Sequence, residues 1–178
     1  MKISDFNHIM LSAETIIKPF KCIDEDLNGF LFEDAKDYLR SKMAVTYLFE
    51  DETDNRTVAY YSLLNDKIIF NPEIKSFWNK INRKIANSKR RKDYPAVKIG
   101  RLAISEEYAN QGLGKGIISI LKYQFSCESR TGCRFLTVDA YSDAVDFYKK
   151  CGFDFVSERD SNDKTRAMYY DLKSFIIS

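Results

Sequence analysis

The sequence predicts an α/β (α+β) fold in which a mixed, mostly antiparallel central sheet is flanked by helices on both faces. Strand-like and helical hydrophobic patterns alternate along the chain. The early strand-like runs follow one another as hairpins, whereas the later runs alternate with helical segments, which favours a sheet with both kinds of strand pairing. The 178 residues, of which 44% are hydrophobic and 30% charged, fit one globular domain, which we assign to residues 1–178.

The N-terminal half begins with an expected strand over residues 3–13, followed by a helix over residues 24–41. Asp24 is a suitable N-cap for that helix. Its apolar residues recur at helical spacing: Leu27, Phe30, Leu31, Ala35, Tyr38 and Leu39. Two strand-like runs come next, Ala44–Phe49 and Thr57–Leu64, and the charged stretch between them predicts a hairpin turn.

The middle of the chain contains a short third run, Lys67–Phe70, and then a helix that starts near Pro72, because proline is favoured in the first helical turn. The next elements are a strand at Pro95–Ile104, a polar loop at Ser105–Asn110 and a helix at Gly112–Glu128.

The C-terminal part is expected to contain a short buried strand, one more helix and a final hairpin. These elements are Phe135–Ala140, Ser142–Cys151 with Gly152 as its stop, and the strands Phe153–Ser157 and Arg166–Leu172 around a polar turn at Arg159–Lys164.

Composition excludes several classes of protein. No apolar run approaches the ~20 residues of a membrane helix, and the N-terminus lacks a signal-peptide pattern, so we expect no membrane association and a cytoplasmic location. The net charge of +2 does not indicate a wholly basic nucleic-acid-binding protein. The four cysteines and the single histidine lack zinc-site spacing, so no metal is expected, and reduced thiols are favoured over a Cys–His catalytic pair.

The segment Gln111–Gly116, QGLGKG, connects the strand at Pro95–Ile104 to the following helix. Glycines allow close approach of a ligand to the backbone, and the first amides of a helix have no intrahelical acceptor. Such a helix start favours anions, pyrophosphate among them. The segment matches neither the Walker A loop nor the GxGxxG fingerprint. A helix that begins with glycines for structural reasons is the alternative.

A second segment, Ala144–Phe153, reads AVDFYKKCGF and predicts a short amphipathic helix with a glycine C-cap. Taken alone, Tyr148 is explained by packing as well as by catalysis. Together the QGLGKG segment after a strand, the buried strand and the AxxFYxxxGF segment closely resemble the GNAT superfamily of N-acetyltransferases over roughly residues 94–172.

This resemblance implies a GNAT-like sheet, acetyl-CoA as the acetyl donor and an amine as the acceptor. It implies that Leu102, Ala103 and Ile104 pair through their backbone with the pantetheine arm. It implies that the pyrophosphate is held by Gln111, Gly112, Leu113, Gly114, Lys115 and Gly116, and that Tyr148 lies beside the thioester sulfur. Many members carry Asn where this chain has Tyr141.

The chemistry of acetyl transfer agrees with these residue types. Direct transfer needs a neutral amine, and a tyrosine with a pKa of about 10 is a reasonable acid for a thiolate whose conjugate acid has a pKa of about 8.5. An α-amine has a pKa near 8, against about 10.4 for lysine, so a dedicated general base is less necessary. Glu106 and Glu107 are expected to be exposed turn residues.

Short segments in both halves are similar to one GNAT branch, which includes toxins that acetylate the α-amine of aminoacyl-tRNA in bacterial toxin–antitoxin pairs. They are Phe20–Cys22, Leu27–Leu31, Tyr60–Leu63, Tyr94–Ile104 and Val138–Ala140. This similarity implies aminoacyl-tRNA as the acceptor and an antitoxin as a partner, and it is compatible with a homodimer.

A basic segment from Lys75 to Lys92 contains no acidic residue and ends in a run of four cations, Lys89, Arg90, Arg91 and Lys92. Such a run supplies the phosphate contacts that tRNA requires. A solvated helix face with a basic loop is the structural alternative. Two other functions also stay open: a housekeeping GNAT acting on a small-molecule or protein amine, and a non-catalytic acetyl-CoA-binding module.

Overall fold

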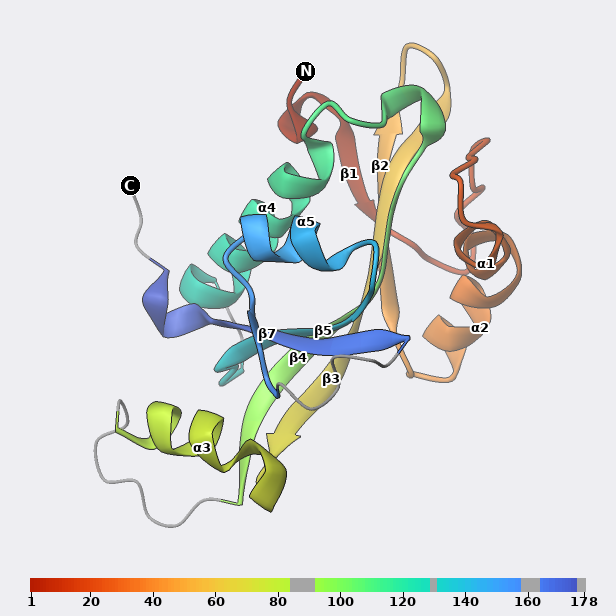
Figure 1. The fold of residues 1–178 in the computed structure, drawn as a ribbon. Coiled ribbons are helices and arrows are strands. Elements are labelled where there is room, and N and C mark those ends of the chain that lie inside the picture. The colour runs from red at the N-terminus through yellow and green to blue at the C-terminus, as the bar shows by residue number, and fades with distance from the viewer. Residues whose placement is uncertain (84–91, 129–130, 158–163, 176–178) are drawn as a thin grey trace. The chain divides into compact units, whose positions relative to one another are not determined.

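The structure is a computed structural model that describes residues 1–83, 92–128, 131–157 and 164–175. Its strands form one sheet with the hydrogen-bonded order β1-β2-β3-β4-β5-β7-β6 (Figure 1). The strands are β1 (Asn7–Met10), β2 (Val45–Asp51), β3 (Arg56–Ile69), β4 (Asp93–Ile104), β5 (Phe135–Tyr141), β6 (Asp154–Phe155) and β7 (Thr165–Asp171). β4 and β5 are parallel, whereas the pairs β1–β2, β2–β3, β5–β7 and β6–β7 are antiparallel. The predicted mixed, mostly antiparallel sheet is confirmed.

The helices follow the predicted order. They are α1 (Glu25–Gly29), α2 (Ala35–Arg40), α3 (Lys75–Asn82), α4 (Leu113–Cys127) and α5 (Val145–Lys150), with a π-helical turn η2 (Phe30–Asp34) joining α1 to α2. Short 3₁₀ turns are η1 (Ile3–Asp5), η3 (Pro72–Ile74), η4 (Glu106–Tyr108) and η5 (Leu172–Ser174).

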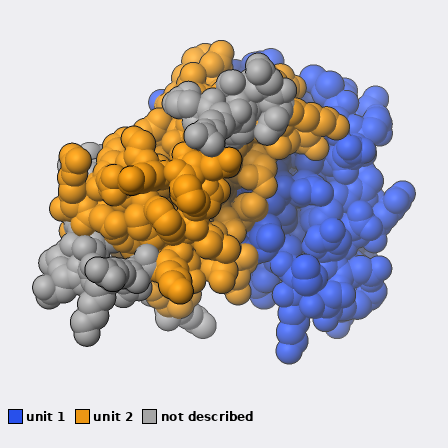
Figure 2. Space-filling view, turned by 60° about the horizontal axis from the view of Figure 1, so that its bottom comes forward, with its two compact units in different colours: residues 1–64, 99–121 blue, residues 65–98, 122–178 orange. Residues whose placement is uncertain are grey.

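The chain divides into two compact units, residues 1–64 with 99–121 and residues 65–98 with 122–178 (Figure 2). Strands β3 and β4 and helix α4 each contribute residues to both units. Each unit has a hydrophobic core of its own.

In the first unit, α1 and α2 lie on one side of β1 and β2, and the start of α4 lies on the other (Figure 1). Asp24 caps α1 as predicted, since its carboxylate accepts from the Asp26 and Leu27 amides at 2.9 and 3.4 Å. Phe30 and Leu31 are buried against the strands, where the Phe30 ring stacks on Tyr60 with a centroid distance of 6.2 Å.

In the second unit, α3 and α5 lie on opposite sides of β5 (Figure 1). Phe77 of α3 packs edge-on against Tyr169 of β7 at 4.7 Å between ring centroids, and it also contacts Phe135 of β5. β5 pairs with β7 along its whole length, and with β4 from Ala96↔Phe135 to Lys98↔Thr137. The expectation of helices on both faces therefore holds within each unit.

Several predictions of the boundaries were wrong, and the strand expected at Phe153–Ser157 covers only Asp154–Phe155. Lys67–Phe70 is not a separate run, because β3 continues without a break through Asp66, whose carboxylate accepts a hydrogen bond from Thr137 at 2.6 Å. The first strand covers only Asn7–Met10, since residues 3–5 form η1. The helix expected from Ser142 begins at Val145. The last two strands pair as a hairpin, but most of its expected turn lies outside the described residues.

Candidate functional site

The predicted pyrophosphate segment forms the N-terminus of α4, in the first unit. The Gly116 amide bonds back to the Gly112 carbonyl at 3.1 Å. The amides of Leu113, Gly114 and Lys115 precede it in the first turn, so the helix offers them no acceptor. These three N–H groups lie at the positive end of a 15-residue helix. The local geometry is therefore that of an anion-binding site.

Two glycines of the segment are required for different reasons. Gly112 has a φ of +78° and open space around it, so it supplies a left-handed backbone conformation before the helix. Gly116 has no room for a side chain, because a Cβ there would lie 2.8 Å from Cγ2 of Ile3. Gln111 is exposed, and its side-chain amide donates to the Glu107 carbonyl at 3.4 Å. Glu107 is also exposed and pairs with Arg56.

The strand residues Leu102, Ala103 and Ile104 border a hollow of about 200 Å³ in the same unit. Its other lining residues are Cys22, Ile23, Asp24, Leu27, Glu106 and Ala109. Cys22 is a poor nucleophile there, because burial raises the pKa of its thiol. The first unit thus combines a mostly apolar hollow beside a strand with an anion site at a helix start.

Tyr148 lies on α5 in the second unit, where the end of the helix fixes its position. The Phe153 amide donates to the Tyr148 carbonyl at 3.0 Å, and the Gly152 amide donates to the Lys149 carbonyl at 2.8 Å. With Gly152 at a φ of +81°, this is a Schellman cap. The hydrophobic contact of that cap is Tyr148 against Phe153, whose ring centroids are 5.4 Å apart. The YxxxGF pattern therefore has a structural basis in the cap.

Tyr148 is buried, with 6% of the residue's surface exposed. Burial raises the pKa of its hydroxyl above the ordinary range for tyrosine, so the hydroxyl stays protonated at neutral pH. Among the described residues, its oxygen has no hydrogen-bond partner. The hydroxyl is therefore available as a donor at neutral pH, and its raised pKa makes it a weaker acid than an exposed tyrosine.

The predicted site residues thus fall into two groups: Leu102–Ile104 and Gln111–Gly116 in the first unit, and Tyr148 in the second. Tyr141, at the position where many GNAT members carry Asn, is 42% exposed. Of the basic run, Lys92 is exposed just before β4, and its carbonyl accepts from the Phe70 amide at 2.8 Å. Residues 89–91 of that run lie outside the described part of the chain.

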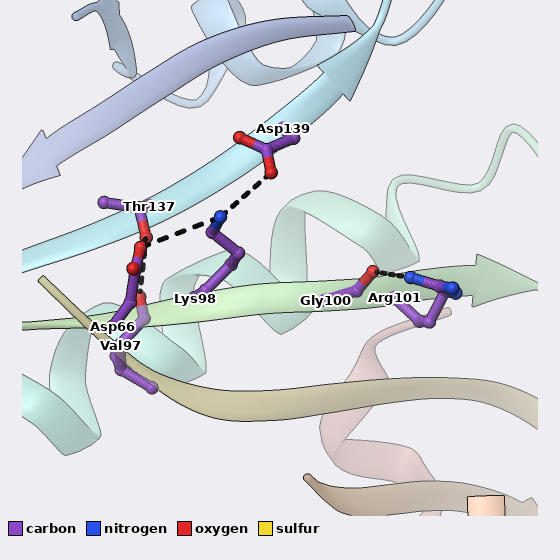
Figure 3. Close-up of polar contacts among 7 residues, drawn as sticks. All are labelled: Asp66, Val97, Lys98, Gly100, Arg101, Thr137 and Asp139. Atoms are coloured by element: carbon purple, nitrogen blue, oxygen red, sulfur yellow. Dashed lines mark hydrogen bonds and ion pairs between the residues drawn. The ribbon is translucent and has the colours of Figure 1, made fainter. Parts of the chain in front are cut away.

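Sequence reasoning missed a charged cluster in the second unit that consists of Asp66, Lys98, Thr137 and Asp139 (Figure 3). The signal was present, since Lys98 and Asp139 each interrupt a strand that is otherwise largely apolar. Burial favours a lower pKa for Lys98, but the hydrogen bond to Asp139 and the charges of Asp139 and Asp66 raise it above its ordinary value. Lys98 is therefore a cation at neutral pH.

Membrane spans and metal sites were also expected to be absent. Within residues 1–83, 92–128, 131–157 and 164–175, no helix is long and apolar enough to cross a membrane. In the same described part of the chain, no group of three or more His, Cys, Asp or Glu side chains is arranged to hold a metal ion.

Several solved structures are similar to this chain over nearly its whole length. The complex of AtaT with acetyl-methionyl-tRNAfMet matches with a TM-score of 0.77 and 25% identity, covering 96% of each chain. AtaTR bound with acetyl-CoA matches with a TM-score of 0.73 and 25% identity, again over 96% of each chain. A tyrosine mutant of KacT matches with a TM-score of 0.72 and 25% identity, over 94% of this chain and 96% of that one.

The model of the acetyltransferase (GNAT) domain family matches residues 41–174, which is well over half of the chain. That range includes strand β4 with Leu102–Ile104, the α4 N-terminus and Tyr148 with its Schellman cap. The chain therefore belongs to the GNAT acetyltransferase family.

Proposed function

We propose that this acetyltransferase moves the acetyl group of acetyl-CoA directly to the α-amine of aminoacyl-tRNA, and that it acts in the cytoplasm as the toxin of a toxin–antitoxin pair. The observation that carries the proposal is the near full-length likeness to AtaT in complex with acetyl-methionyl-tRNAfMet. Other matched structures are described as AtaT toxin bound to the C-terminus of the antitoxin AtaR and as a KacTA–DNA complex. A small antitoxin is accordingly the partner that we expect.

The residues of the first unit fit acetyl-CoA. The amides of Leu113, Gly114 and Lys115, which have no acceptor within the helix, offer three donors to a pyrophosphate, and the positive φ of Gly112 shapes the turn that precedes them. The hollow beside Leu102–Ile104 is lined mainly by apolar side chains, which suits the pantetheine arm. Acetyl-CoA, when bound, supplies the acetyl group as a thioester.

Tyr148 is the proposed catalytic acid. Its hydroxyl is protonated at neutral pH and donates its proton to the departing thiolate sulfur, becoming a phenolate that solvent then reprotonates. The neutral acceptor nitrogen attacks the carbonyl carbon, the C–S bond breaks, and the nitrogen releases its extra proton to solvent as the amide forms. No covalent enzyme intermediate is therefore required. The raised thiol pKa of Cys22 agrees with this, since a cysteine nucleophile requires a lowered pKa.

A tRNA acceptor requires a surface that binds phosphates. We assign this role to Lys89, Arg90, Arg91 and Lys92, a run of four cations within a segment that lacks acidic residues. An α-amine also suits a site without a dedicated base, because its pKa near 8 leaves a useful fraction neutral at pH 7.

The test is a set of acceptors incubated with purified protein and labelled acetyl-CoA: charged tRNA, the same tRNA without its amino acid, a polyamine and a lysine-containing peptide. We expect label on charged tRNA alone. Label on the polyamine or the peptide, with none on charged tRNA, would identify a housekeeping acetyltransferase. No label on any acceptor, despite measurable binding of acetyl-CoA, would favour a non-catalytic module.

A further inference from the structure

The second unit contains a cavity of about 470 Å³, which is within the range of small-molecule sites. Residues of β3, β4, β5 and β7 line it, together with η3 and the segment after β6. The apolar lining residues are Ile68, Ile69, Ile74, Val138, Val156, Ala167 and Met168. The polar ones are Asp66, Lys67, Asn71, Glu73, Lys98, Thr137, Asp139 and Ser157. The cavity is therefore amphipathic.

The charged cluster lies at this cavity and is held in a defined arrangement (Figure 3). The Lys98 ammonium donates to Oδ2 of Asp139 at 2.9 Å and lies 3.9 Å from Oδ2 of Asp66. Thr137 donates to that same Asp66 oxygen at 2.6 Å. Lys98 and Asp66 are mostly buried, with side chains 27% and 24% exposed, whereas Asp139 is 54% exposed.

The cluster has an excess of negative charge, because two carboxylates face one ammonium. Oδ1 of Asp66 and Oδ1 of Asp139 have no hydrogen-bond partner among the described residues. Lys98 is already paired, so it has little capacity to recognise an anion. A second cation is thus favoured beside the two carboxylates, and partial burial strengthens that attraction.

We propose that this cavity binds the acceptor end of the substrate, with the primary ammonium group held by Asp66 and Asp139 and an apolar side chain placed against Ile74, Val138 and Met168. The ligand class is an amino acid linked through its carboxyl group, as an ester or an amide, with its α-amine free. This proposal rests on the proposed function and names the group that the acetyl is transferred to. The two carboxylates raise the pKa of the bound α-ammonium above its free value near 8, so the held acceptor must lose its proton before the nitrogen can attack.

The probes are L-methioninamide, which has a free α-ammonium group, and N-acetyl-L-methioninamide, which lacks it. Binding is measured by calorimetry and by NMR shifts of the methyl groups of Ile74, Val138 and Met168, without acetyl-CoA or tRNA. We expect the amide to bind about tenfold more tightly than its acetylated form, the scale of one charge-assisted hydrogen bond. Equal affinity of the two probes would overturn the proposal.

Substitutions of Asp66 and Asp139 test whether these carboxylates bind the ammonium group of the probe. Asp139→Asn and Asp66→Asn keep the shape of each side chain, and each should weaken binding of L-methioninamide by about tenfold. The matched control is Asp154→Asn, which removes an exposed ion pair with Lys80 in the same unit, at 3.1 Å, without touching the cavity. The control should bind as the wild type does. Wild-type affinity in both Asp66→Asn and Asp139→Asn would overturn the proposal.

Lys98→Met should change the affinity for L-methioninamide in the opposite direction to the two aspartate substitutions. Removing the resident ammonium leaves two carboxylates for the probe, so binding of L-methioninamide should become tighter, with melting temperature as the check on folding. Loss of binding in a folded Lys98→Met protein would mean that Lys98 recognises the ligand, and the proposal would be wrong.

Failure of this pocket differs from failure of the proposed function. Probe binding with no acetylation of charged tRNA would leave the pocket standing and remove the toxin function. Acetylation of charged tRNA with a wild-type KM in Asp139→Asn and Asp66→Asn would support the toxin function and show that the pocket does not bind the acceptor.

Discussion

Replacing Tyr148 with Phe separates catalysis from stability. Phe keeps the ring that packs against Phe147 and Phe153, at centroid distances of 5.0 and 5.4 Å. The variant loses only a hydroxyl that has no hydrogen-bond partner among the described residues, so the free energy of unfolding should change by no more than about 1 kcal/mol. Losing a general acid should lower kcat by about 10²–10⁴-fold, or about 3–5 kcal/mol of transition-state stabilisation.

The assay follows the release of free CoA thiol with charged tRNA as the acceptor, while calorimetry measures acetyl-CoA binding and urea denaturation measures stability. Acetyl-CoA affinity should stay close to that of the wild type. Tyr169→Phe is the matched control, because Tyr169 is also buried in the second unit, where it packs on Phe77. A Tyr148→Phe enzyme with wild-type kcat would refute the proposed role of Tyr148, and so would a large loss of stability that explains the lost activity.

Three further changes test the helix start, the proton donor and the basic run. Gly112→Ala should lower the free energy of unfolding by about 1–2 kcal/mol in urea denaturation, because the φ of Gly112 is +78°. The control is Gly29→Ala, which should raise the free energy of unfolding by about 0.5–1 kcal/mol, because Gly29 has a helical φ of −58° and open space around it. Equal changes in the two variants would contradict this interpretation. The rate of transfer should rise with pH as the α-amine deprotonates near pH 8. It should then stay level to about pH 10, because burial holds the pKa of Tyr148 above its ordinary value. A decline in rate below about pH 9 would count against Tyr148 as the acid. Replacing Lys89, Arg90, Arg91 and Lys92 with Ala should make the salt dependence of tRNA binding shallower by about 0.7–0.9 log units for every phosphate that is no longer neutralised, and an unchanged slope would remove the run from the tRNA interface.

The features that the sequence predicted well depend on residues close together in the chain. Asp24 caps α1 through the amides two and three positions later, and Gly152 ends α5 through bonds within five residues. The start of the helix near Pro72 is of the same kind, since Asn71 accepts from the Glu73 amide at 2.6 Å. Such caps leave a recognisable local pattern, and their positions were correct to within a few residues.

The features that the sequence did not predict depend on distant contacts. Asn65 and Asp66 have the composition of a strand break, yet β3 passes through them because Thr137 and Lys98 satisfy the Asp66 carboxylate. The π-helical turn at Phe30–Asp34 lies where Phe30 and Leu31 are buried against the sheet, so tertiary packing accompanies this departure from a regular helix.

The candidate site divides in the same way. The α4 N-terminus and Tyr148 could be proposed as site residues from the sequence, because each lies in a recognisable segment. The cluster of Asp66, Lys98, Thr137 and Asp139 comes from three strands, and the register Lys98↔Thr137 brings its members together. A slip of one residue would turn these side chains to the other face of the sheet, and nothing in the sequence alone specifies that register.

The position of the transferred acetyl group tests the central claim most directly. Methionyl-tRNA is incubated with the enzyme and ¹³C-acetyl-CoA, the ester is cleaved with mild base, and the released amino acid and the tRNA are analysed separately by mass spectrometry. We predict N-acetylmethionine with the ¹³C label and unmodified tRNA. Free methionine without label, or label on the tRNA nucleotides, would contradict transfer to the α-amine.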